Sequence, residues 1–210
     1  MEDYFNKLKK YNFWEGNVPS LGFERKTYSD AILDYTGNKL IKVLTGQRRV
    51  GKSYLLRQIA DKIIKQGISA ENIVYLNKEF TDFDFIGNYK ELEKLIEIYR
   101  NKINPKGKIY LFIDEVQNIE GWEHFVNSYS QNYVDSYEIF ISGSNSKMLS
   151  GELATLLSGR YVSFEIFPFG FCEYAQVLEK EKNKQTYIEY MESGGLPELY
   201  ELPNEQTKRN

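Results

Sequence analysis

Gly46-Gln47-Arg48-Arg49-Val50-Gly51-Lys52-Ser53 is the stretch of this sequence that decides the fold. Its glycines, lysine and serine fit the pattern G-x-x-x-x-G-K-[ST]. A short, mostly apolar run at 40–44 precedes it and is expected to be a buried strand, while residues 52–66 carry apolar side chains at helical spacing. A glycine-bearing loop between a strand and a helix predicts a nest of backbone N–H groups that can hold an anion.

Each constrained position of the loop has a chemical reason. The glycines let the backbone bend tightly around an anion, and Lys52 can reach the β- and γ-phosphates of a nucleotide. The Ser53 hydroxyl can bind Mg²⁺. The side chains of Arg48 and Arg49 are expected to point outward, although the Arg49 N–H should line the cradle. The expected nucleotide-binding residues are therefore Gly46, Arg49, Val50, Gly51, Lys52, Ser53 and Tyr54.

An acidic pair, Asp114-Glu115, follows five apolar residues at 109–113. Carboxylates at the end of a buried strand are costly unless they meet water or a cation. We expect Asp114 to hold Mg²⁺, directly or through water, and Glu115 to act as the general base on the attacking water. The alternative is a solvated strand end with no chemical role.

Strand and helix patterns alternate along the chain, which predicts a parallel sheet covered on both faces. Sites in such folds lie at the carboxyl ends of the strands, where the polar residues named here fall. Further strands are expected at 73–76, 109–113, 138–141 and 161–167. Further helices are expected at 91–100, 122–133, 149–157, 171–179 and 187–191, and residues 30–35 could end another helix.

Lys52 and Glu115 are the main candidates for catalytic residues, and Asn145 and Arg160 are weaker candidates. Asn145, after the fourth expected strand, could orient the attacking water or touch the γ-phosphate, or it could be a cap or turn residue. Arg160, just before the fifth expected strand, could contact phosphate in its own chain or in a neighbouring chain, or form a surface ion pair. The residues alone leave these alternatives open.

Length and composition exclude several classes of protein. The chain has 210 residues, 41% of them hydrophobic, which suits one packed α/β domain with at most a small appendage. Its formal net charge of −3 gives no global basic field for non-specific nucleic-acid binding. Because Cys172 and His124 each occur once, no internal disulfide and no zinc-type ligand set is expected. Without a signal-like start or a long apolar run, we expect a cytoplasmic protein with no membrane span.

Taken together, these motifs resemble the AAA+ ATPases of bacteria and archaea that carry a C-terminal domain of unknown function, near the archaeal-ATPase and origin-recognition-like branch. The resemblance covers most of the chain from about Phe23 onward. Besides the loop, it rests on Phe112-Ile113-Asp114-Glu115-Val116-Gln117, Ser142-Gly143-Ser144-Asn145-Ser146, Gly159-Arg160, Phe167-Pro168-Phe169 and Gly194-Gly195-Leu196-Pro197-Glu198. It implies a five-stranded parallel P-loop sandwich of strand order 5-1-4-3-2 with a small helical lid. It also implies that Asp114 and Glu115 form the second nucleotide motif and that Asn145 is the sensor residue.

The resemblance also implies a division of the chain. Residues 1–167 correspond to the ATPase core, and residues 168–210 correspond to part of a helical lid or to a linker toward a missing C-terminal domain. Relatives of this kind continue well beyond Pro197, whereas this sequence stops at Asn210, so we expect a fragment. The expected partner is an unidentified protein or DNA, reached through the missing domain, and assembly into a homo-oligomer is left open.

ATP is the expected ligand, Mg²⁺ the expected cofactor, and ATP hydrolysis coupled to that partner the expected activity. One alternative is a non-enzymatic, nucleotide-gated scaffold that binds ATP with little turnover. Another is a P-loop small-molecule kinase, although such kinases rarely need an acidic pair with a polar sensor strand. A GTPase is disfavoured because none of the Asn-Lys pairs is completed to the guanine-recognition pattern Asn-Lys-x-Asp.

Overall fold

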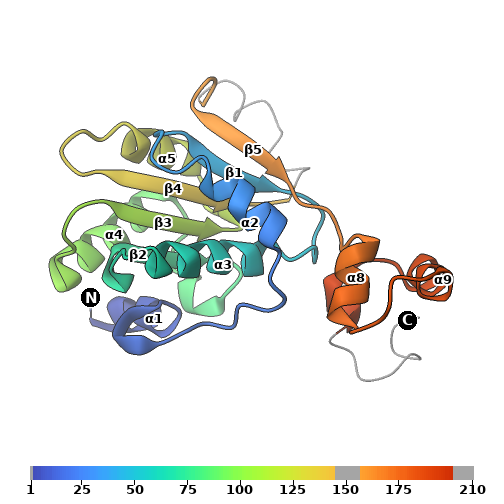
Figure 1. Ribbon diagram of the computed structural model, residues 1–210. Helices are drawn as coiled ribbons and strands as arrows, with labels where there is room; N and C mark the ends of the chain where they lie inside the picture. Colours follow the sequence, from blue (N-terminus) through green and yellow to red (C-terminus); the bar gives the residue numbers. More distant parts are fainter. Residues whose placement is uncertain (1, 145–156, 201–210) are drawn as a thin grey trace.

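A parallel β-sheet with helices on both faces forms the body of the protein (Figure 1). The computed structural model describes residues 2–144 and 157–200. Within them the strands are β1 (Ile41–Thr45), β2 (Ile73–Asn77), β3 (Ile109–Asp114), β4 (Tyr137–Ser142) and β5 (Tyr161–Glu165). Their order across the sheet is β2-β3-β4-β1-β5, and every pairing is parallel. This is the order 5-1-4-3-2 seen from the other edge, so the expected fold class and strand order are confirmed.

The register of the strands brings the ends of four of them to one edge of the sheet. Leu44 of β1 pairs with Ser142 of β4, and Asn77 of β2 pairs with Asp114 of β3. All residues of β1, β2 and β4 are buried, as expected for strands covered on both faces. The carboxyl ends of β1 to β4 therefore meet at one edge, as parallel pairing requires.

Helices cover the two faces of the sheet unequally. The α-helices are α1 (Glu2–Lys10), α2 (Lys26–Leu33), α3 (Lys52–Lys65), α4 (Tyr89–Ile103), α5 (Trp122–Ser130), α8 (Phe171–Val177) and α9 (Lys184–Ser193). Short 3-10 helices are η1 (Trp14–Gly16), η2 (Ala70–Asn72), η3 (Thr81–Phe83), η4 (Val116–Asn118) and η5 (Pro197–Tyr200). Side chains of α2 and α3 form one apolar cluster with sheet residues such as Phe112 and Phe140, and those of α1, α4 and α5 form a second with residues such as Leu111 and Ile139.

Residues 2–17 contribute a helix and a turn that the sequence patterns do not reveal. The side-chain amide of Asn12 accepts a hydrogen bond from the backbone N–H of Tyr75 at 2.6 Å and donates to its carbonyl at 2.9 Å. The indole N–H of Trp14 donates to the carbonyl of Ile73 at 2.8 Å. Two side chains thus occupy the hydrogen-bonding groups of β2, which is an edge strand of the sheet.

Helices α8 and α9 lie beyond the carboxyl edge of the sheet, apart from the layered body (Figure 1). They are joined to it where Phe169 N–H donates to the Gly195 carbonyl at 2.6 Å. A Cβ atom at Gly195 would lie 2.2 Å from the carbonyl oxygen of Phe169, so only glycine permits this contact. The Gly194-Gly195 pair, read from the sequence as a helix end, also holds the helical segment to the end of β5.

Most predicted elements are confirmed, with small differences at their ends. Helix α4 begins two residues earlier than expected because Asn88 and Glu91 form a capping box. Helix α9 begins at Lys184 rather than near Tyr187, since Asn183 caps it by accepting from Thr186 N–H at 3.0 Å. The helix expected at 149–157 lies almost wholly outside the described residues.

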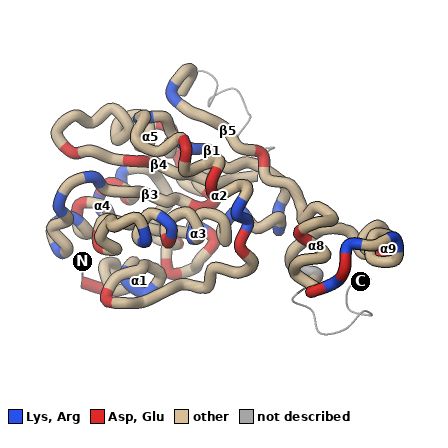
Figure 2. The backbone as a smooth tube through the Cα atoms, viewed as in Figure 1, with Lys and Arg blue, Asp and Glu red and all other residues tan. Residues whose placement is uncertain are grey.

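Charge is dispersed over the fold. Basic and acidic residues alternate along the backbone without gathering over one element in the view of Figure 2. In the described part of the chain, no helix combines the length and the apolar character needed to cross a membrane. A buried exception to the apolar interior is the pair Lys42–Glu138, whose side chains are 0% and 1% exposed and join β1 to β4.

Candidate functional site

The loop after β1 begins with a close backbone contact. Gly46 has φ of 142°, and a Cβ atom there would lie 2.3 Å from the carbonyl oxygen of Ile166, just after β5. Only glycine lets the loop start so near the neighbouring strand. The loop then turns through Arg49, which has φ of 68°, and enters α3 at Lys52. This is the strand–loop–helix arrangement that the sequence pattern predicts.

Lys52 lies inside the loop rather than in solvent. Its ammonium donates to the carbonyls of Gly46 and Gln47 at 3.1 and 3.0 Å. Its Nζ is 4.0 Å from Glu115 Oε1. Burial lowers the pKa of Lys52, while the nearby carboxylates of Glu115 and Asp114 act against that shift. A buried cation is therefore aimed at the space above the loop, where an anion would meet it with little competition from water.

Asp114 is the most enclosed acid of the site, with no exposed surface. Its carboxylate accepts hydrogen bonds from Tyr75 OH at 3.0 Å and Asn77 Nδ2 at 2.9 Å, and from the Ser142 hydroxyl. Burial raises the pKa of Asp114, and the hydroxyls of Ser142 and of Ser53, the last residue of the loop motif, oppose the rise. The acidic strand end and the loop therefore lie side by side.

Glu115 has an unusual backbone conformation. Its φ and ψ are 53° and 46°, a left-handed conformation that is uncommon for a non-glycine residue and that a few other residues of the chain, such as Glu15 and Asn104, also adopt. Its N–H donates to the Ser142 hydroxyl at 3.3 Å, and its carboxylate accepts a hydrogen bond from the Gln117 side chain. The carboxylate is therefore fixed next to Lys52 at the carboxyl edge of β3.

Two adjoining cavities open at this edge. The larger, about 600 Å³, lies over the loop and is lined by Arg48, Arg49, Gly51, Lys52, Ser53, Tyr54, Glu79, Glu115 and Pro197. The smaller, about 210 Å³, is mainly apolar and is lined by Gly22, Phe23, Arg25, Gly51, Tyr54, Phe169, Val177, Pro197 and Tyr200. Gly51, Tyr54 and Pro197 border both cavities, so one elongated ligand with a charged and an apolar part could span them.

The oxygen atoms beside the loop fit a magnesium ion. The Ser53 hydroxyl and the Asp114 carboxylate are hard oxygen donors, and the hydroxyl is near enough to oppose the rise that burial causes in the pKa of the carboxyl group. Mg²⁺ typically takes one or two protein oxygens and completes its coordination with phosphates and water. The described residues contain no group of three or more His, Cys, Asp or Glu that could hold a metal ion without such help.

The structure brings most of the expected site residues together. Gly46, Arg49, Val50, Gly51, Lys52, Ser53 and Tyr54 form the loop and the start of α3, and Asp114 and Glu115 lie beside them. The Arg48 side chain is exposed, borders the larger cavity and pairs with Glu79 at 2.5 Å. Asn145 lies outside the described residues, so its sensor role stays a prediction.

Arg160 is the exception. It precedes β5 at the amino edge of the sheet, opposite the loop, and its guanidinium hydrogen-bonds to the Asn127 side chain. A contact between Arg160 and a phosphate held by its own chain does not fit this position, because a full strand length separates the two edges. Of the alternatives read from the sequence, only a contact with a neighbouring chain or a surface role remains.

Sequence reasoning missed several residues that shape the site. Asn77 and Ser142 end their strands next to Asp114, and Gln117 holds Glu115. Asn77 and Ser142 could have been found from the sequence, because each is a polar residue at the end of an apolar strand. Neighbouring parallel strands end at one edge of the sheet, so such residues lie close to Asp114. Gln117 had no such signal, because its contact depends on the unusual backbone conformation of Glu115.

A parallel sheet of this order, with a phosphate-type loop after β1 and a buried acidic pair ending β3, defines the P-loop nucleotide-binding ATPase-like proteins of the AAA+ type. A family model described as "AAA domain" matches residues 38–175. The chain belongs to this AAA domain family.

Relatives and solved structures agree with this assignment. An uncharacterized protein of Haemophilus influenzae is 38% identical over 179 residues, covering 83% of this chain and 44% of its own length. An uncharacterized protein of Methanocaldococcus jannaschii is 33% identical over 180 residues, covering 80% and 38%. The chain thus spans less than half of the length of either relative. The structure of AMPPCP-bound DnaA from Aquifex aeolicus superposes with a TM-score of 0.55 at 18% identity, over 94% of this chain and 66% of that one.

Proposed function

We propose that this chain binds ATP with Mg²⁺ at the loop 46–53 and hydrolyses its γ-phosphate bond. One observation carries the proposal: Lys52, Ser53, Asp114 and Glu115, which lie on two separate motifs, meet at one edge of the sheet, where Ser53 opposes the rise that burial causes in the pKa of Asp114 and Lys52 Nζ lies 4.0 Å from Glu115 Oε1. A purely structural strand end would not need a buried acid, a buried ammonium and a strained glutamate side by side.

The loop residues supply the binding of phosphate. The free backbone N–H groups at the start of α3 form the positive end of the helix and can face a phosphate, and Lys52 adds a charge for the terminal phosphates. Ser53 and Asp114 would hold Mg²⁺, which when bound neutralises charge on the phosphate oxygens. Because Asp114 is fully buried, a cation nearby favours the ionised form of its carboxylate.

Glu115 supplies the base in this proposal. Its carboxylate would accept a proton from the water that attacks the γ-phosphorus, while the bond to the leaving ADP oxygen breaks. The Gln117 amide and the Ser142 hydroxyl hold the side chain and backbone of Glu115 in position, so little reorganisation is needed at the moment of reaction. Asn145 and, from a neighbouring chain, Arg160 stay proposed additions to this catalytic group.

The smaller cavity is our candidate for the nucleobase. It adjoins the phosphate cavity through Gly51 and Tyr54, and aromatic side chains from three segments line it, among them Phe23 and Phe169. A flat purine ring gains stacking and apolar contact in such surroundings. The Arg57 guanidinium lies 4.4 Å over the Tyr54 ring and supports that ring at the junction of the two cavities.

The helical segment and the partner complete the proposal. We propose that residues 1–167 are the nucleotide-binding core and that residues 168–210 act as part of a lid or as a linker, because α8 and α9 lie beyond the carboxyl edge, beside the smaller cavity. The relatives, of which this chain covers 44% and 38%, support the proposal that a further domain couples hydrolysis to a protein or DNA partner.

The test of nucleotide binding is Lys52→Ala, followed by calorimetry with a non-hydrolysable ATP analogue and Mg²⁺. Loss of one charge-assisted contact predicts affinity weaker by about tenfold to a hundredfold, from about 1.5–3 kcal/mol. Lys65→Ala is the matched control, because Lys65 lies on the same helix but pairs only with nearby Asp61 on the surface. Equal affinity of the two variants would contradict the assignment of the loop.

A further inference from the structure

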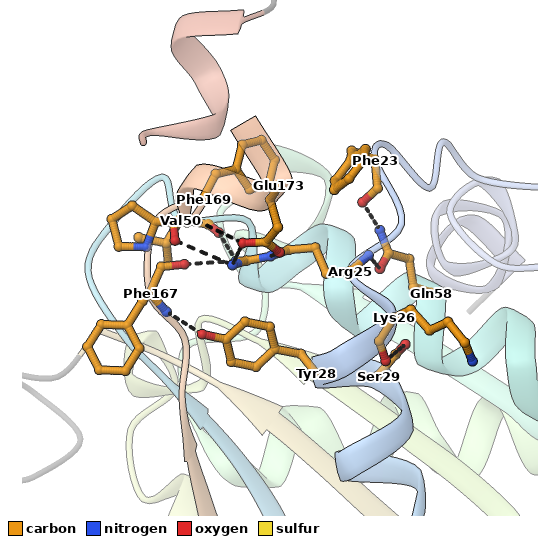
Figure 3. Close-up of polar contacts among 12 residues, drawn as sticks. Phe23, Arg25, Lys26, Tyr28, Ser29, Val50, Gln58, Phe167, Phe169 and Glu173 are labelled. Carbon is orange, nitrogen blue, oxygen red and sulfur yellow. Dashed lines mark hydrogen bonds and ion pairs between the residues drawn. The ribbon is translucent and has the colours of Figure 1, made fainter. Parts of the chain in front are cut away.

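Arg25 is a buried cation whose side chain is 3% exposed and whose N–H groups all have acceptors. Nε and Nη2 donate to the two carboxylate oxygens of Glu173 at 2.7 and 2.9 Å (Figure 3). Nη1 donates to the carbonyls of Val50 at 3.1 Å and Phe167 at 2.8 Å, and Nη2 also reaches the Pro168 carbonyl at 3.5 Å. This set uses the five donors of a guanidinium, which no other side chain can supply.

The acceptors come from three separate segments of the fold. Val50 belongs to the phosphate loop, Phe167 and Pro168 form the connection after β5, and Glu173 lies in the first turn of α8. One guanidinium therefore joins the phosphate loop to the helical segment beyond the sheet.

The position of Arg25 is itself fixed by its neighbours. Its guanidinium lies 4.5 Å from the centre of the Tyr28 ring and 5.2 Å from that of Phe169. Its backbone N–H donates to the side chain of Gln58 on α3 at 3.1 Å. Because the Arg25 side chain has little freedom to move by itself, a displacement of Glu173 would be transmitted through it to the Val50 carbonyl.

The contact with the Val50 carbonyl orients a group of the phosphate cradle. The described chain has no cis peptide bond, so the carbonyl of Val50 and the N–H of Gly51 point in opposite directions from one peptide plane. The carbonyl is turned inward to Arg25, and Gly51 lines the larger cavity. Holding the carbonyl therefore directs the Gly51 N–H toward the space over the loop.

We propose that Arg25 is a positioning residue that orients the phosphate cradle and, through Glu173, couples it to α8. The inference rests on the proposed nucleotide site and adds a route by which the helical segment controls it. Because coupling between two sites is reciprocal, moving α8 weakens the binding of phosphate groups, and binding of phosphate groups steadies α8.

The first test measures binding of three probes, namely ATP, tripolyphosphate and adenosine, to the wild type and to Glu173→Gln. Glutamine keeps the size of the side chain and its cap on Gly170 N–H but loses the charge that pairs with Arg25. We expect about fivefold or greater weakening for ATP and tripolyphosphate and a smaller change for adenosine, because Arg25 also borders the cavity proposed for the nucleobase. Arg25→Lys should act in the same direction and more strongly, because lysine keeps the charge but cannot make the bidentate contact.

Asp135→Asn is the matched control for Glu173→Gln. Asp135 accepts from Arg100 at 2.7 Å and is about as exposed as Glu173, at 27% against 26%, but it lies far from the loop. This variant should bind all three probes as the wild type does. Equal weakening of all three probes in Glu173→Gln, or a change for adenosine alone, would overturn the positioning role.

The second test measures the reverse direction of the coupling. Hydrogen exchange of the amides in 171–177 should slow when the wild type binds ATP and should respond less in Glu173→Gln at saturating ATP. Absence of slowing in the wild type would overturn the coupling. The outcomes distinguish the proposed nucleotide site from the proposed role of Arg25. If Lys52→Ala leaves ATP affinity unchanged, the nucleotide site is wrong. If Lys52→Ala weakens ATP binding but Glu173→Gln and Arg25→Lys do not, only the role of Arg25 is wrong.

Discussion

Glu115 combines a left-handed backbone conformation with a buried position beside Lys52. Its left-handed conformation costs about 1–2 kcal/mol relative to ordinary backbone, and its hydrogen bonds to Ser142 and Gln117 offset that cost. The strain turns the carboxylate toward Lys52 instead of letting it continue the direction of β3. A residue placed in this way is suited to act on a small molecule, such as water, above the loop.

The division of roles between the two acids predicts different behaviour for their amides. Glu115→Gln keeps the shape and the hydrogen bonding of the side chain but removes the base, so it should bind ATP normally and lose hydrolysis by about 100-fold or more. Single-turnover release of phosphate measures this. The same measurement distinguishes an ATPase from a nucleotide-gated scaffold, because the wild type of a scaffold would release little phosphate.

Asp114→Asn provides the contrast. Its buried carboxylate is our candidate for holding Mg²⁺, so this variant should bind ATP with a weaker dependence on Mg²⁺. If both variants lose only Mg²⁺-dependent affinity, the assignment of Glu115 as the base is wrong.

Among single residues, the sequence motifs identified those at fixed motif positions. They missed the residues whose contacts form only when distant parts of the chain fold together. Lys52, Ser53 and the acidic pair stand at fixed positions of two short sequence motifs, so the motifs alone identify them. Arg25 has no such pattern, because its role depends on Glu173, which is 148 residues away along the chain.

Among the elements, the positions of the strands were easier to predict than the contacts of the polar side chains within them. Four apolar runs became β1 to β4 because burial along the strand leaves an apolar pattern, whereas β5 is only partly buried and its sequence is less apolar. The charge pair Lys42–Glu138 is hidden within two of those runs. The helix α1 was missed because its short, charge-rich sequence has only Leu8 fully buried.

Breaking the Lys42–Glu138 pair should destabilise the strand pair β1–β4. Glu138→Leu leaves the ammonium of Lys42 buried without its carboxylate, which predicts a loss of about 3–5 kcal/mol in the free energy of unfolding. Lys108→Met is the matched control, because its pair with Glu138 is 32% exposed on the lysine side and should contribute less than about 1 kcal/mol. Urea unfolding compares them, and equal losses would contradict the buried pair as the source.

The same pair predicts a dependence of stability on pH. Burial works against the charge of Glu138, but hydrogen bonds from Lys42 and Lys108 outweigh it and lower the pKa of Glu138 below its ordinary value of 4.5. A carboxyl group with a lowered pKa in the folded state contributes stability above its unfolded pKa and loses it as the pH falls through the folded value. The difference in stability between wild type and Glu138→Leu should therefore shrink below pH about 4.5.

For the molecule as a whole, we expect slow ATP hydrolysis by the isolated chain. The residues gathered at the loop provide phosphate binding, metal ligands and a base, whereas Arg160 lies at the opposite edge of the sheet. An arginine supplied from outside a site of this type is worth about 10³ to 10⁵ in turnover. Only a neighbouring chain could bring Arg160 to this site.

The measurement is phosphate release per chain as a function of protein concentration, for the wild type and Arg160→Ala. A rate that rises with concentration in the wild type and stays flat in the variant is the expected result for an arginine supplied by a neighbour. Fast turnover that is independent of concentration would contradict the expectation of an incomplete site. Identical behaviour of the two proteins would make Arg160 a surface residue.

The side chains of Asn12 and Trp14, which cover the free edge of β2, have a practical consequence for anyone who shortens this protein. A chain trimmed to the matched region, from residue 38, would lose both and leave the edge groups of Ile73 and Tyr75 open to strands of other molecules. Uncovered edge strands are templates for aggregation. Light scattering should show that the shortened protein aggregates with time. A failure of that protein to bind ATP would then reflect aggregation rather than a defective site.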